Sequence, residues 1–373
     1  MPMVTAAVAR GPHTPLAIEE LEMESPRADE VLVRIAATGV CHTDVIARDQ
    51  WFPVPAPVVL GHEGAGVVEA VGSCVRRVAP GDRVVLSFDS CGDCGPCTRA
   101  RPSYCLEAFE RSFGAVRRDG TMALRRGDEP VHSHFFGQSS FATYALAMER
   151  SVVKVDTDVP LDLLGPLGCG VQTGAGAVLN ALRCEQGTSL AVFGAGAVGL
   201  SAVMAAQVAG CTTVIAVDLN DRRGKLALEL GATHAVNPND GDVVQAVIDA
   251  SNGGVDYALD TTGNPGVVRA SIEALGPLGV AGIVGSPPID AELRVEMHKV
   301  FFGRTVRGII EGDSVPERFI PEMIRLYEAG RFPFDRLVAF YELGDINRAL
   351  EDSESGAVVK PVIRMAGSIG GGT

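Results

Sequence analysis

The sequence predicts a two-domain α/β protein that combines a β-rich domain with a doubly wound parallel sheet. Three observations support this fold class. The chain has 373 residues, enough for two domains, and 46% of them are hydrophobic, so a large core can be buried. Short alternating runs with turns between them occupy the first 150 residues. From about residue 175, strand patterns alternate with helix patterns.

The elements follow from local patterns along the chain. Val-rich alternating runs predict strands at 31–35, 66–71 and 82–86. Buried strands are expected at 190–193, 214–217, 256–259 and 279–284, with helices at 200–208 and 222–230, and such repeated units form parallel sheets. A helix is expected at 315–329 with Ser314 as its N-cap, followed by a strand at 359–365. The Gly-rich end, 367–373, is expected to fray.

Charge and hydropathy argue against nucleic acid and membranes as partners. The formal net charge is −14, and the one modest arginine cluster, at 117–126, is expected to be a solvated loop. The uncharged stretches at 163–182 and 187–217 break into strand-sized and helix-sized pieces, so no transmembrane helix is predicted. The start lacks the pattern of a secretory signal, which predicts a cytoplasmic protein with reduced cysteines.

Four cysteines lie within fifteen residues, in a segment rich in Gly, Pro and Asp: Cys91, Cys94, Cys97 and Cys105. This C-x2-C-x2-C-x7-C spacing suits a closed tetrahedral Zn²⁺ site. An iron–sulfur cluster is the main competing interpretation, although Leu106 stands where one known cluster pattern has proline. A third interpretation is that the four are incidental free cysteines. A closed site leaves zinc no open position, so its expected role is to stabilise this lobe.

A second set of candidate ligands is widely separated: Cys41, His62, Glu63 and Cys169. A catalytic zinc takes three protein ligands and keeps one position open, and two Cys with one His is a known combination. Taken singly, Cys169 is more typical of a small buried hydrophobic residue, and His62 of a structural histidine. Spacing alone does not join these residues.

A Gly-rich turn follows the apolar strand at 190–193 and precedes a helix; it comprises Gly194, Gly196, Ala197, Val198 and Gly199. The glycines of G-x-G-x-x-G let a pyrophosphate approach the helix N-terminus. Asp218 ends the next strand, where a carboxylate binds a ribose 2′-OH and repels a 2′-phosphate. The pattern predicts NAD binding, with Leu219 and Arg223 beside Asp218; the charges of Arg222 and Arg223 weaken the preference for NAD slightly.

Together these motifs resemble those of the zinc-dependent medium-chain alcohol dehydrogenase family over nearly the full chain. The resemblance rests on the four-cysteine lobe and on segments 39–44, 61–64, 168–170, 194–199 and 313–316. Segments 136–141 and 360–363 look most like the bacterial aryl-alcohol (benzyl alcohol) and geraniol dehydrogenases. The resemblance implies a GroES-like, partly opened β-barrel catalytic domain at 1–170, an NAD-binding Rossmann domain at 171–308, and a C-terminal segment at 309–373 that completes the catalytic domain.

The resemblance also implies a role for each candidate residue. Cys41, His62 and Cys169 would bind a catalytic zinc, making two Zn²⁺ per chain, and Glu63 would approach this zinc during ligand exchange. Zinc would hold the alcohol as an alkoxide, from which hydride passes to NAD⁺. The supporting residues would be Thr43 for the alcohol proton, Asp44 for orienting His62, His42 for the cofactor pyrophosphate and Thr173 for the nicotinamide side. A helix-cap hydroxyl is the alternative role for Thr43.

The chain departs from the family pattern at two positions. Ile46 stands where many members have a histidine that ends a proton relay, so the proton is expected to leave directly to water or through another base. Lys360 stands where the family has an arginine that can pair with the glutamate near the metal. A lysine ammonium is a point charge, whereas the guanidinium is a planar fork.

Four aromatic residues match pocket-lining positions of the family: Trp51, Phe52, Phe135 and Phe136. Ordinary core aromatics are the alternative interpretation. Aromatic walls favour flat or long apolar molecules. The resemblance therefore implies an NAD-dependent enzyme that interconverts primary aryl or allylic alcohols, such as benzyl alcohol, cinnamyl alcohol and geraniol, with their aldehydes.

Two other functions stay open on the sequence. A dehydrogenase of hydroxymethyl adducts of a cellular thiol would need cations at the pocket mouth, which the sequence does not identify. A non-catalytic, zinc-stabilised binding protein would hold one zinc per chain. Family members are homodimers or homotetramers that commonly pair through an edge strand, expected here near 282–285. Cys74, Cys184 and Cys211 are interpreted as core or incidental residues.

Overall fold

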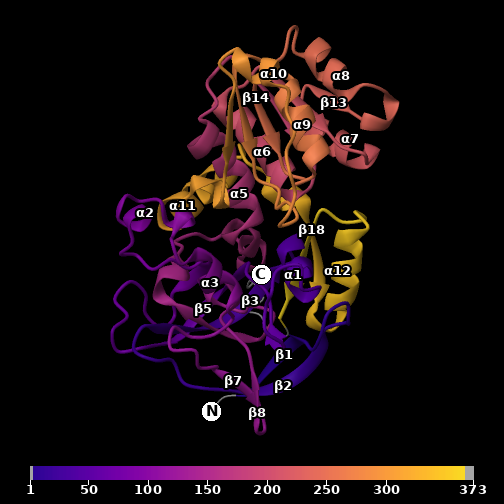
Figure 1. Ribbon diagram of the computed structural model, residues 1–373. Helices are drawn as coiled ribbons and strands as arrows, with labels where there is room; N and C mark the ends of the chain where they lie inside the picture. Colours follow the sequence, from indigo (N-terminus) through magenta and orange to yellow (C-terminus); the bar gives the residue numbers. More distant parts are fainter. Residues whose placement is uncertain (1–2, 366–373) are drawn as a thin grey trace. The chain divides into compact units, whose positions relative to one another are not determined.

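The computed structural model describes residues 3–365, which divide into two compact units (Figure 1). Unit 1 comprises residues 3–169, 315–325 and 335–365, and unit 2 comprises residues 170–314 and 326–334. The two-part α/β fold class expected from the sequence is confirmed. The predicted frayed end, 367–373, lies outside the described residues.

Unit 1 is built on two β-sheets. Strand β3 (Glu30–Gly39) is central to the larger sheet and pairs antiparallel with β5, β9 and β18. The larger sheet runs β10 (Val152–Lys154), β6 (Arg83–Leu86), β5 (Gly64–Val71), β3, β18 (Lys360–Arg364) and β17 (Val338–Glu342), with β9 (Tyr144–Met148) paired to β3. The smaller sheet runs β4 (Val58–Val59), β1 (Met3–Ala9), β2 (Ala17–Met23), β7 (Leu124–Arg126) and β8 (Glu129–Val131).

The C-terminal segment completes the larger sheet of unit 1. Strand β18 pairs with β3, and Figure 1 shows β18 and α12 in yellow beside the indigo α1. One hydrophobic core joins both ends of the chain, because Val4, Phe141 and Ile363 are fully buried in the same cluster. The helices of this unit are α1 (His42–Arg48), α2 (Gly95–Thr98), α3 (Ala108–Phe113), α4 (Leu161–Leu164) and α12 (Ile346–Glu354).

Unit 2 is a parallel six-stranded sheet with helices between its strands. The strand order is β13 (His234–Val236), β12 (Thr213–Val217), β11 (Ser189–Phe193), β14 (Val255–Asp260), β15 (Leu275–Ile283) and β16 (Thr305–Gly308), and every pairing is parallel. This order, 3-2-1-4-5-6, is that of doubly wound dinucleotide-binding sheets. The helices are α5 (Gly170–Gly176), α6 (Ala197–Ala209), α7 (Asp221–Glu229), α8 (Val243–Ala250), α9 (Pro265–Glu273) and α10 (Met297–Phe301).

Two sequence expectations are wrong in detail. The segment near 282–285 is not at a sheet edge, because β15 is flanked by β14 and β16, and β16 is the edge strand. Helix α11 (Pro316–Glu328), which begins in unit 1, is not capped by the Ser314 side chain, whose buried hydroxyl has no hydrogen-bond partner among residues 3–365. Instead, the Val315 carbonyl accepts from the Phe319 amide, and Pro316 needs no partner for an amide hydrogen.

Candidate active site

The fold of unit 1 brings the widely separated candidate ligands together. One ligand atom from each of Cys41, His62, Glu63 and Cys169 lies within 4.8 Å of the others. Cys41 directly precedes α1, His62 and Glu63 directly precede β5, and Cys169 follows the short helical turn Gly165–Gly168. His62 is 1% exposed, and Glu63 is fully buried. The cluster therefore lies inside unit 1 and depends on pairings between distant segments.

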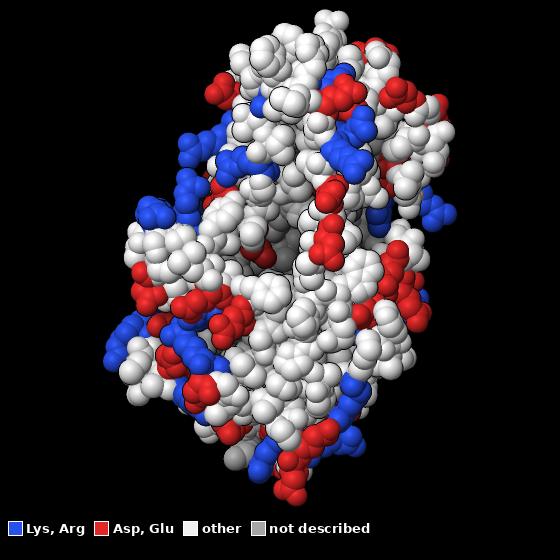
Figure 2. All heavy atoms as spheres, in the orientation of Figure 1, with Lys and Arg blue, Asp and Glu red and all other residues white. Residues whose placement is uncertain are grey.

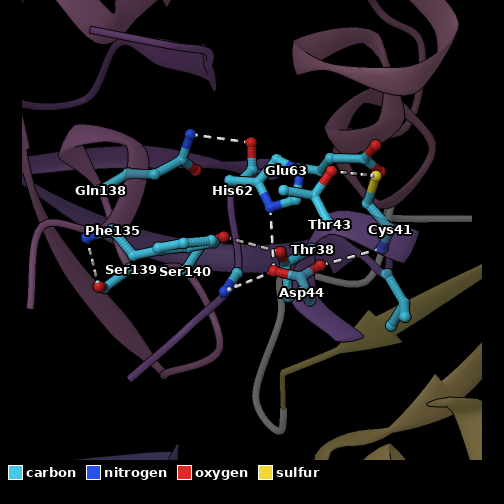
Figure 3. A network of polar contacts seen from close by, with 12 residues as sticks. Thr38, Cys41, Thr43, Asp44, His62, Glu63, Phe135, Gln138, Ser139 and Ser140 are labelled. Atoms are coloured by element: carbon cyan, nitrogen blue, oxygen red, sulfur yellow. Dashed lines mark hydrogen bonds and ion pairs between the residues drawn. The ribbon is translucent and has the colours of Figure 1, made fainter. Parts of the chain in front are cut away.

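Asp44 fixes the orientation of His62. Its Oδ1 lies 2.9 Å from His62 Nδ1 and accepts a hydrogen bond from the Gly61 amide, while its Oδ2 accepts from the Cys41 amide (Figure 3). With Nδ1 donating to the carboxylate, His62 Nε2 carries the lone pair. This atom is buried and has no hydrogen-bond partner among the described residues. An orphaned imidazole nitrogen beside two thiols is a donor set that fits Zn²⁺.

The charged groups around the cluster perturb one another. A hydrogen bond with Cys169 is the largest effect on the Cys41 thiol and holds its pKa well below the usual value, although burial opposes it. Burial lowers the pKa of His62, but the Asp44 carboxylate outweighs burial and raises it. Burial also raises the pKa of Glu63 to about 7 against the attraction of Lys360. Thiolates and carboxylates held this close together favour a bound cation.

Lys360 and Glu63 form a buried ion pair at the edge of this cluster. The Lys360 ammonium donates to both Glu63 carboxylate oxygens, at 2.9 and 3.0 Å, and to the Val40 carbonyl at 3.0 Å. Burial lowers the pKa of Lys360, but the Glu63 carboxylate outweighs it and raises the pKa. A lysine thus meets the carboxylate from the C-terminal strand β18, where the family pattern has an arginine.

Thr43 lies on the first turn of α1 beside the cluster. The Cys41 thiol lies 3.7 Å from the Thr43 hydroxyl and is positioned to donate to it (Figure 3). Thr43 is not the N-cap residue of α1, because Cys41 occupies that position. The side chain of Ile46, where a relay histidine was considered, is buried, and His42 is exposed.

Gln138 is a supporting residue to which sequence reasoning gave no role. Its Nε2 donates to the His62 carbonyl at 2.9 Å (Figure 3), and its Oε1 accepts from the Gly64 amide at 3.1 Å. Ser140 bonds the Thr38 hydroxyl at 2.8 Å in the same network. The available signal was a run of polar residues at 138–140 between aromatic neighbours, because buried polar groups need partners.

The predicted pocket aromatics divide into two kinds. Phe136 stacks on the His62 ring with centroids 4.6 Å apart, and Phe135 meets the same ring edge-on at 5.6 Å. Both phenylalanines are nearly or fully buried. Phe52 is half-buried, whereas Trp51 is 61% exposed. The structure therefore brings Phe135 and Phe136, but not Trp51, into contact with a candidate ligand.

The four-cysteine lobe forms a separate cluster in unit 1. Its four sulfur atoms lie within 4.8 Å of one another, with Cys91 and Cys97 sulfurs 3.8 Å apart and Cys94 and Cys105 sulfurs 4.0 Å apart. Zinc–sulfur bonds of about 2.3 Å in a tetrahedron give sulfur separations of about 3.8 Å, so the lobe fits Zn²⁺. Backbone amides of Leu106 and Cys97 lower the pKa of Cys94 to about 6, which favours its thiolate form, whereas a hydrogen bond with Asp93 raises the pKa of Cys91 to about 12.

The Gly-rich turn of unit 2 has the shape of a phosphate-binding turn. Gly194 has φ +97°, and a side chain there would meet the Thr261 hydroxyl, whereas a Cβ at Gly196 would meet nothing within 4 Å. That open space lies at the N-terminus of the 13-residue α6, where Gly199 packs against the Gly194 carbonyl. A diphosphate group fits such a helix start, because free amides and the helix dipole attract anions.

Apart from His42 on α1, the other predicted cofactor residues lie around this turn or on α5. Asp218 directly follows β12 and accepts hydrogen bonds from the Ala195 amide at 2.7 Å and the Asn220 amide at 2.8 Å. Arg223 lies 4.0 Å from the same carboxylate, and Leu219 is exposed. Ala197 and Val198 begin α6. Thr173 on α5 is nearly buried and donates to the Glu311 carboxylate at 3.2 Å.

Comparisons with known proteins agree with this arrangement. The family model of the alcohol dehydrogenase GroES-like domain matches residues 27–157, and that of the zinc-binding dehydrogenases matches residues 197–329. A geraniol dehydrogenase of Castellaniella defragrans is 51% identical over 361 residues, which cover 96% of both chains. The chain belongs to the zinc-dependent medium-chain alcohol dehydrogenase family. The family expected from the sequence motifs is therefore confirmed.

Solved structures of this family match almost the whole chain. The benzyl alcohol dehydrogenase of Acinetobacter calcoaceticus has a TM-score of 0.95 and 46% identity, covering 98% of this chain and 100% of that one. A zinc-binding alcohol dehydrogenase domain protein of Burkholderia ambifaria has a TM-score of 0.96 and 55% identity, with 97% and 99% covered. The protein is thus an alcohol dehydrogenase, and its family binds zinc and a nicotinamide dinucleotide.

On the face drawn in Figure 2, basic and acidic residues are interspersed. Within residues 3–365, no helix is long and apolar enough to cross a membrane.

Proposed function

We propose that the protein interconverts primary aryl or allylic alcohols and their aldehydes, with NAD⁺ as hydride acceptor and two Zn²⁺ per chain. The observation that carries the proposal is the buried, unpartnered Nε2 of His62, grouped with the thiols of Cys41 and Cys169. The Phe136 ring stacked on His62 adds an aromatic surface beside these ligands. Two relatives named for geraniol and benzyl alcohol support the substrate class.

In this mechanism, Cys41, His62 and Cys169 would hold a Zn²⁺ that would supply Lewis-acid stabilisation of negative charge on the alcohol oxygen, and NAD⁺ would serve as the hydride acceptor. The protein's own residues orient the ligands and handle the proton of the alcohol. Asp44 holds the His62 ring in the tautomer that presents Nε2. The Thr43 hydroxyl, next to the Cys41 sulfur, would relay the alcohol proton, accepting it while donating its own proton to water or to another base.

Glu63 and Lys360 form a buried ion pair beside the candidate zinc ligands. Because the Lys360 ammonium contacts both carboxylate oxygens, it favours the ionised form of Glu63 against burial and keeps the group within reach of the other ligand atoms. In this arrangement each buried charge of the pair is compensated by the other.

The preference for NAD is supported by Asp218 and Arg223. The carboxylate at the end of β12 repels a 2′-phosphate. Arg223 lies 4.0 Å from that carboxylate, so its charge is directed at Asp218. We place the dinucleotide on unit 2, with the pyrophosphate at the start of α6 and Thr173 on the nicotinamide side. His42 is exposed on α1 of unit 1, and its role toward the pyrophosphate stays a prediction.

The test combines kinetics with metal analysis on one sample. The expected result is two zinc ions per chain by elemental analysis and a higher kcat/KM for benzyl alcohol, cinnamyl alcohol and geraniol than for ethanol, with NAD⁺ preferred over NADP⁺. One zinc and no turnover would contradict the proposal. A wide preference for ethanol would contradict the substrate class alone.

We also propose that the protein is a homo-oligomer that pairs through the β16 edge of unit 2. The large apolar side chains around this edge are exposed, among them Leu278 at 78%, Met297 at 88% and Phe301 at 81%. Exposed apolar side chains beside an unpaired strand edge are typical of an interface. Phe301→Glu is expected to lower the mass measured by light scattering, and an unchanged mass would contradict this interface.

A further inference from the structure

A row of aromatic side chains connects His62 with the surface of unit 1. Phe136 stacks on His62, Phe113 lies edge-on to Phe136 at 5.4 Å, and Phe109 lies 5.0 Å from Phe113. Exposure increases along the row, because Phe136 is 8% exposed and Phe109 is 55% exposed. The row thus joins the candidate metal ligand to aromatic surface accessible to solvent.

The outer part of this row belongs to a single short helix. Phe109 and Phe113 are four residues apart on α3, so both rings lie on one helix face. Phe52 packs against both, with ring centroids 5.9 Å from Phe109 and 5.0 Å from Phe113. No sequence motif marks Phe109 or Phe113. They lie just after the segment whose evident pattern is that of its four cysteines.

The four-cysteine lobe holds α3 in place. The Cys105 carbonyl accepts from the Ala108 amide at 3.0 Å, so the helix begins from a ligand of the lobe. Arg111 of the same helix donates to Asp89 at 2.8 Å, and Asp89 is buried two residues before Cys91. Both flanks of the cysteine segment therefore anchor α3.

We propose that the four-cysteine lobe determines substrate choice by presenting Phe109 and Phe113 as the outer wall for the aryl or allylic part of the alcohol. This inference rests on the proposed function and deepens it. An alcohol whose oxygen lies beside His62 extends its apolar part along Phe136 toward α3. A ring or a conjugated chain reaches Phe113 and Phe109, whereas ethanol is too short to do so. Arg111 acts as a positioning residue, because it fastens α3 to Asp89 and does not contact the substrate.

The test compares a long and a short alcohol on the intact protein with saturating NAD⁺. Phe113→Ala and Phe109→Ala are expected to lower kcat/KM for cinnamyl alcohol about tenfold, mainly through KM, because an aromatic contact is worth about this factor. For ethanol, kcat/KM is expected to stay within about twofold. Leu106→Ala, an equally apolar truncation at a 77% exposed position of the same lobe, is the control and should change neither value.

The anchor is tested separately by Arg111→Met and Arg111→Lys. Arg111→Met is expected to raise KM for cinnamyl alcohol with kcat nearly unchanged, and Arg111→Lys to restore part of the affinity through its ion pair with Asp89. Unchanged KM for cinnamyl alcohol in all four variants would overturn the inference. Equal losses for cinnamyl alcohol and ethanol would also overturn it, since they indicate general destabilisation.

A binding measurement separates this inference from the proposed function. Trp51 is the only tryptophan of the chain and adjoins Phe52, so its emission can follow a titration with cinnamyl alcohol without turnover. If the wild type oxidises no alcohol, the proposed function is contradicted, and the wall is then judged by this titration alone. A Kd about tenfold higher in Phe113→Ala than in wild type supports the wall, and an equal Kd overturns it.

Discussion

Unit 1 contains two sulfur-rich clusters that are built in opposite ways. The four-cysteine lobe takes all its ligands from fifteen consecutive residues, and three of those cysteines are partly exposed. The second cluster takes its ligands from three segments that span residues 41 to 169, and His62 and Glu63 are almost fully buried. The first is made by local chain geometry, and the second is made by the fold.

This difference predicts whether each cluster needs a bound metal to keep its structure. The lobe has short elements and few buried side chains, so a metal held by its four cysteines would supply much of its stability. The second cluster is held by hydrogen bonds to the Asp44 carboxylate, by those of Gln138 and by the Lys360 ion pair, none of which requires a metal. Metal removal should therefore unfold the first cluster locally and leave the second one in shape.

The largest expected effect is that of Cys97→Ala on the lobe. Structural zinc sites couple about 10–16 kcal/mol of binding free energy to folding in small peptides. The variant should lose one zinc per chain, and the amides of the cysteine segment should lose their protection from hydrogen exchange. Protection that stays at the wild-type level would show that the lobe folds without its metal.

The same type of substitution at the second cluster, Cys169→Ala, should abolish activity but leave hydrogen exchange unchanged. One zinc is again lost and alcohol oxidation falls below detection, because the metal that polarises the alcohol is missing. Hydrogen exchange around α1 and β5 should stay close to wild type, since the scaffold of Asp44, Gln138 and Lys360 is intact. Local unfolding there would remove the distinction between the two clusters.

A third buried charge cluster of unit 1 tests whether such a scaffold stabilises without any metal. Burial raises the pKa of Glu30, but hydrogen bonds from His134 and Arg117 outweigh burial and lower it from 4.5 to about 2. A lowered pKa means that the ionised group stabilises the folded state above pH 4.5, by about 3 kcal/mol, and that this is lost as the pH falls toward 2.

Glu30→Gln should therefore lower the free energy of unfolding at pH 7 and flatten its dependence on pH between 5 and 2, measured by urea denaturation. Glu69→Gln is the matched control, because its carboxylate is half-exposed and lies 3.7 Å from Arg34. An exposed pair of this kind contributes about 0–1 kcal/mol. Equal pH profiles for Glu30→Gln and wild type would refute the assigned role of Glu30.

The smallest expected effect concerns the scaffold of the second cluster. Asp44→Asn leaves one acceptor oxygen for three donors, the amides of Cys41 and Gly61 and the His62 ring. Zinc affinity is expected to fall about 10–100-fold, measured by competition with a chelator. Asp49→Asn, at the other end of α1, should leave this affinity unchanged. A wild-type affinity in Asp44→Asn would mean that His62 needs no orienting partner.

Much of the fold could be predicted because its signals are local. The strand at 190–193, the turn at Gly194 and the helix after it were readable from alternation and glycine spacing, and they lie in β11 and α6. The N-cap of α11 could not be read in this way, because Ser314 is buried where its hydroxyl meets no free amide of the helix. The sequence also could not show that β16, and not β15, is the edge strand, because this depends on the strand order in the folded sheet.

The sequence by itself determined the two-part α/β fold, the four-cysteine lobe and the dinucleotide turn, since each is encoded within one short stretch of chain. Only the tertiary structure decided that Cys41, His62 and Cys169 meet, that Gln138 supports His62, and that α3 presents Phe109 and Phe113. The physical reason is distance along the chain. Contacts between remote segments depend on strand pairing and burial across the whole unit, which no local pattern specifies.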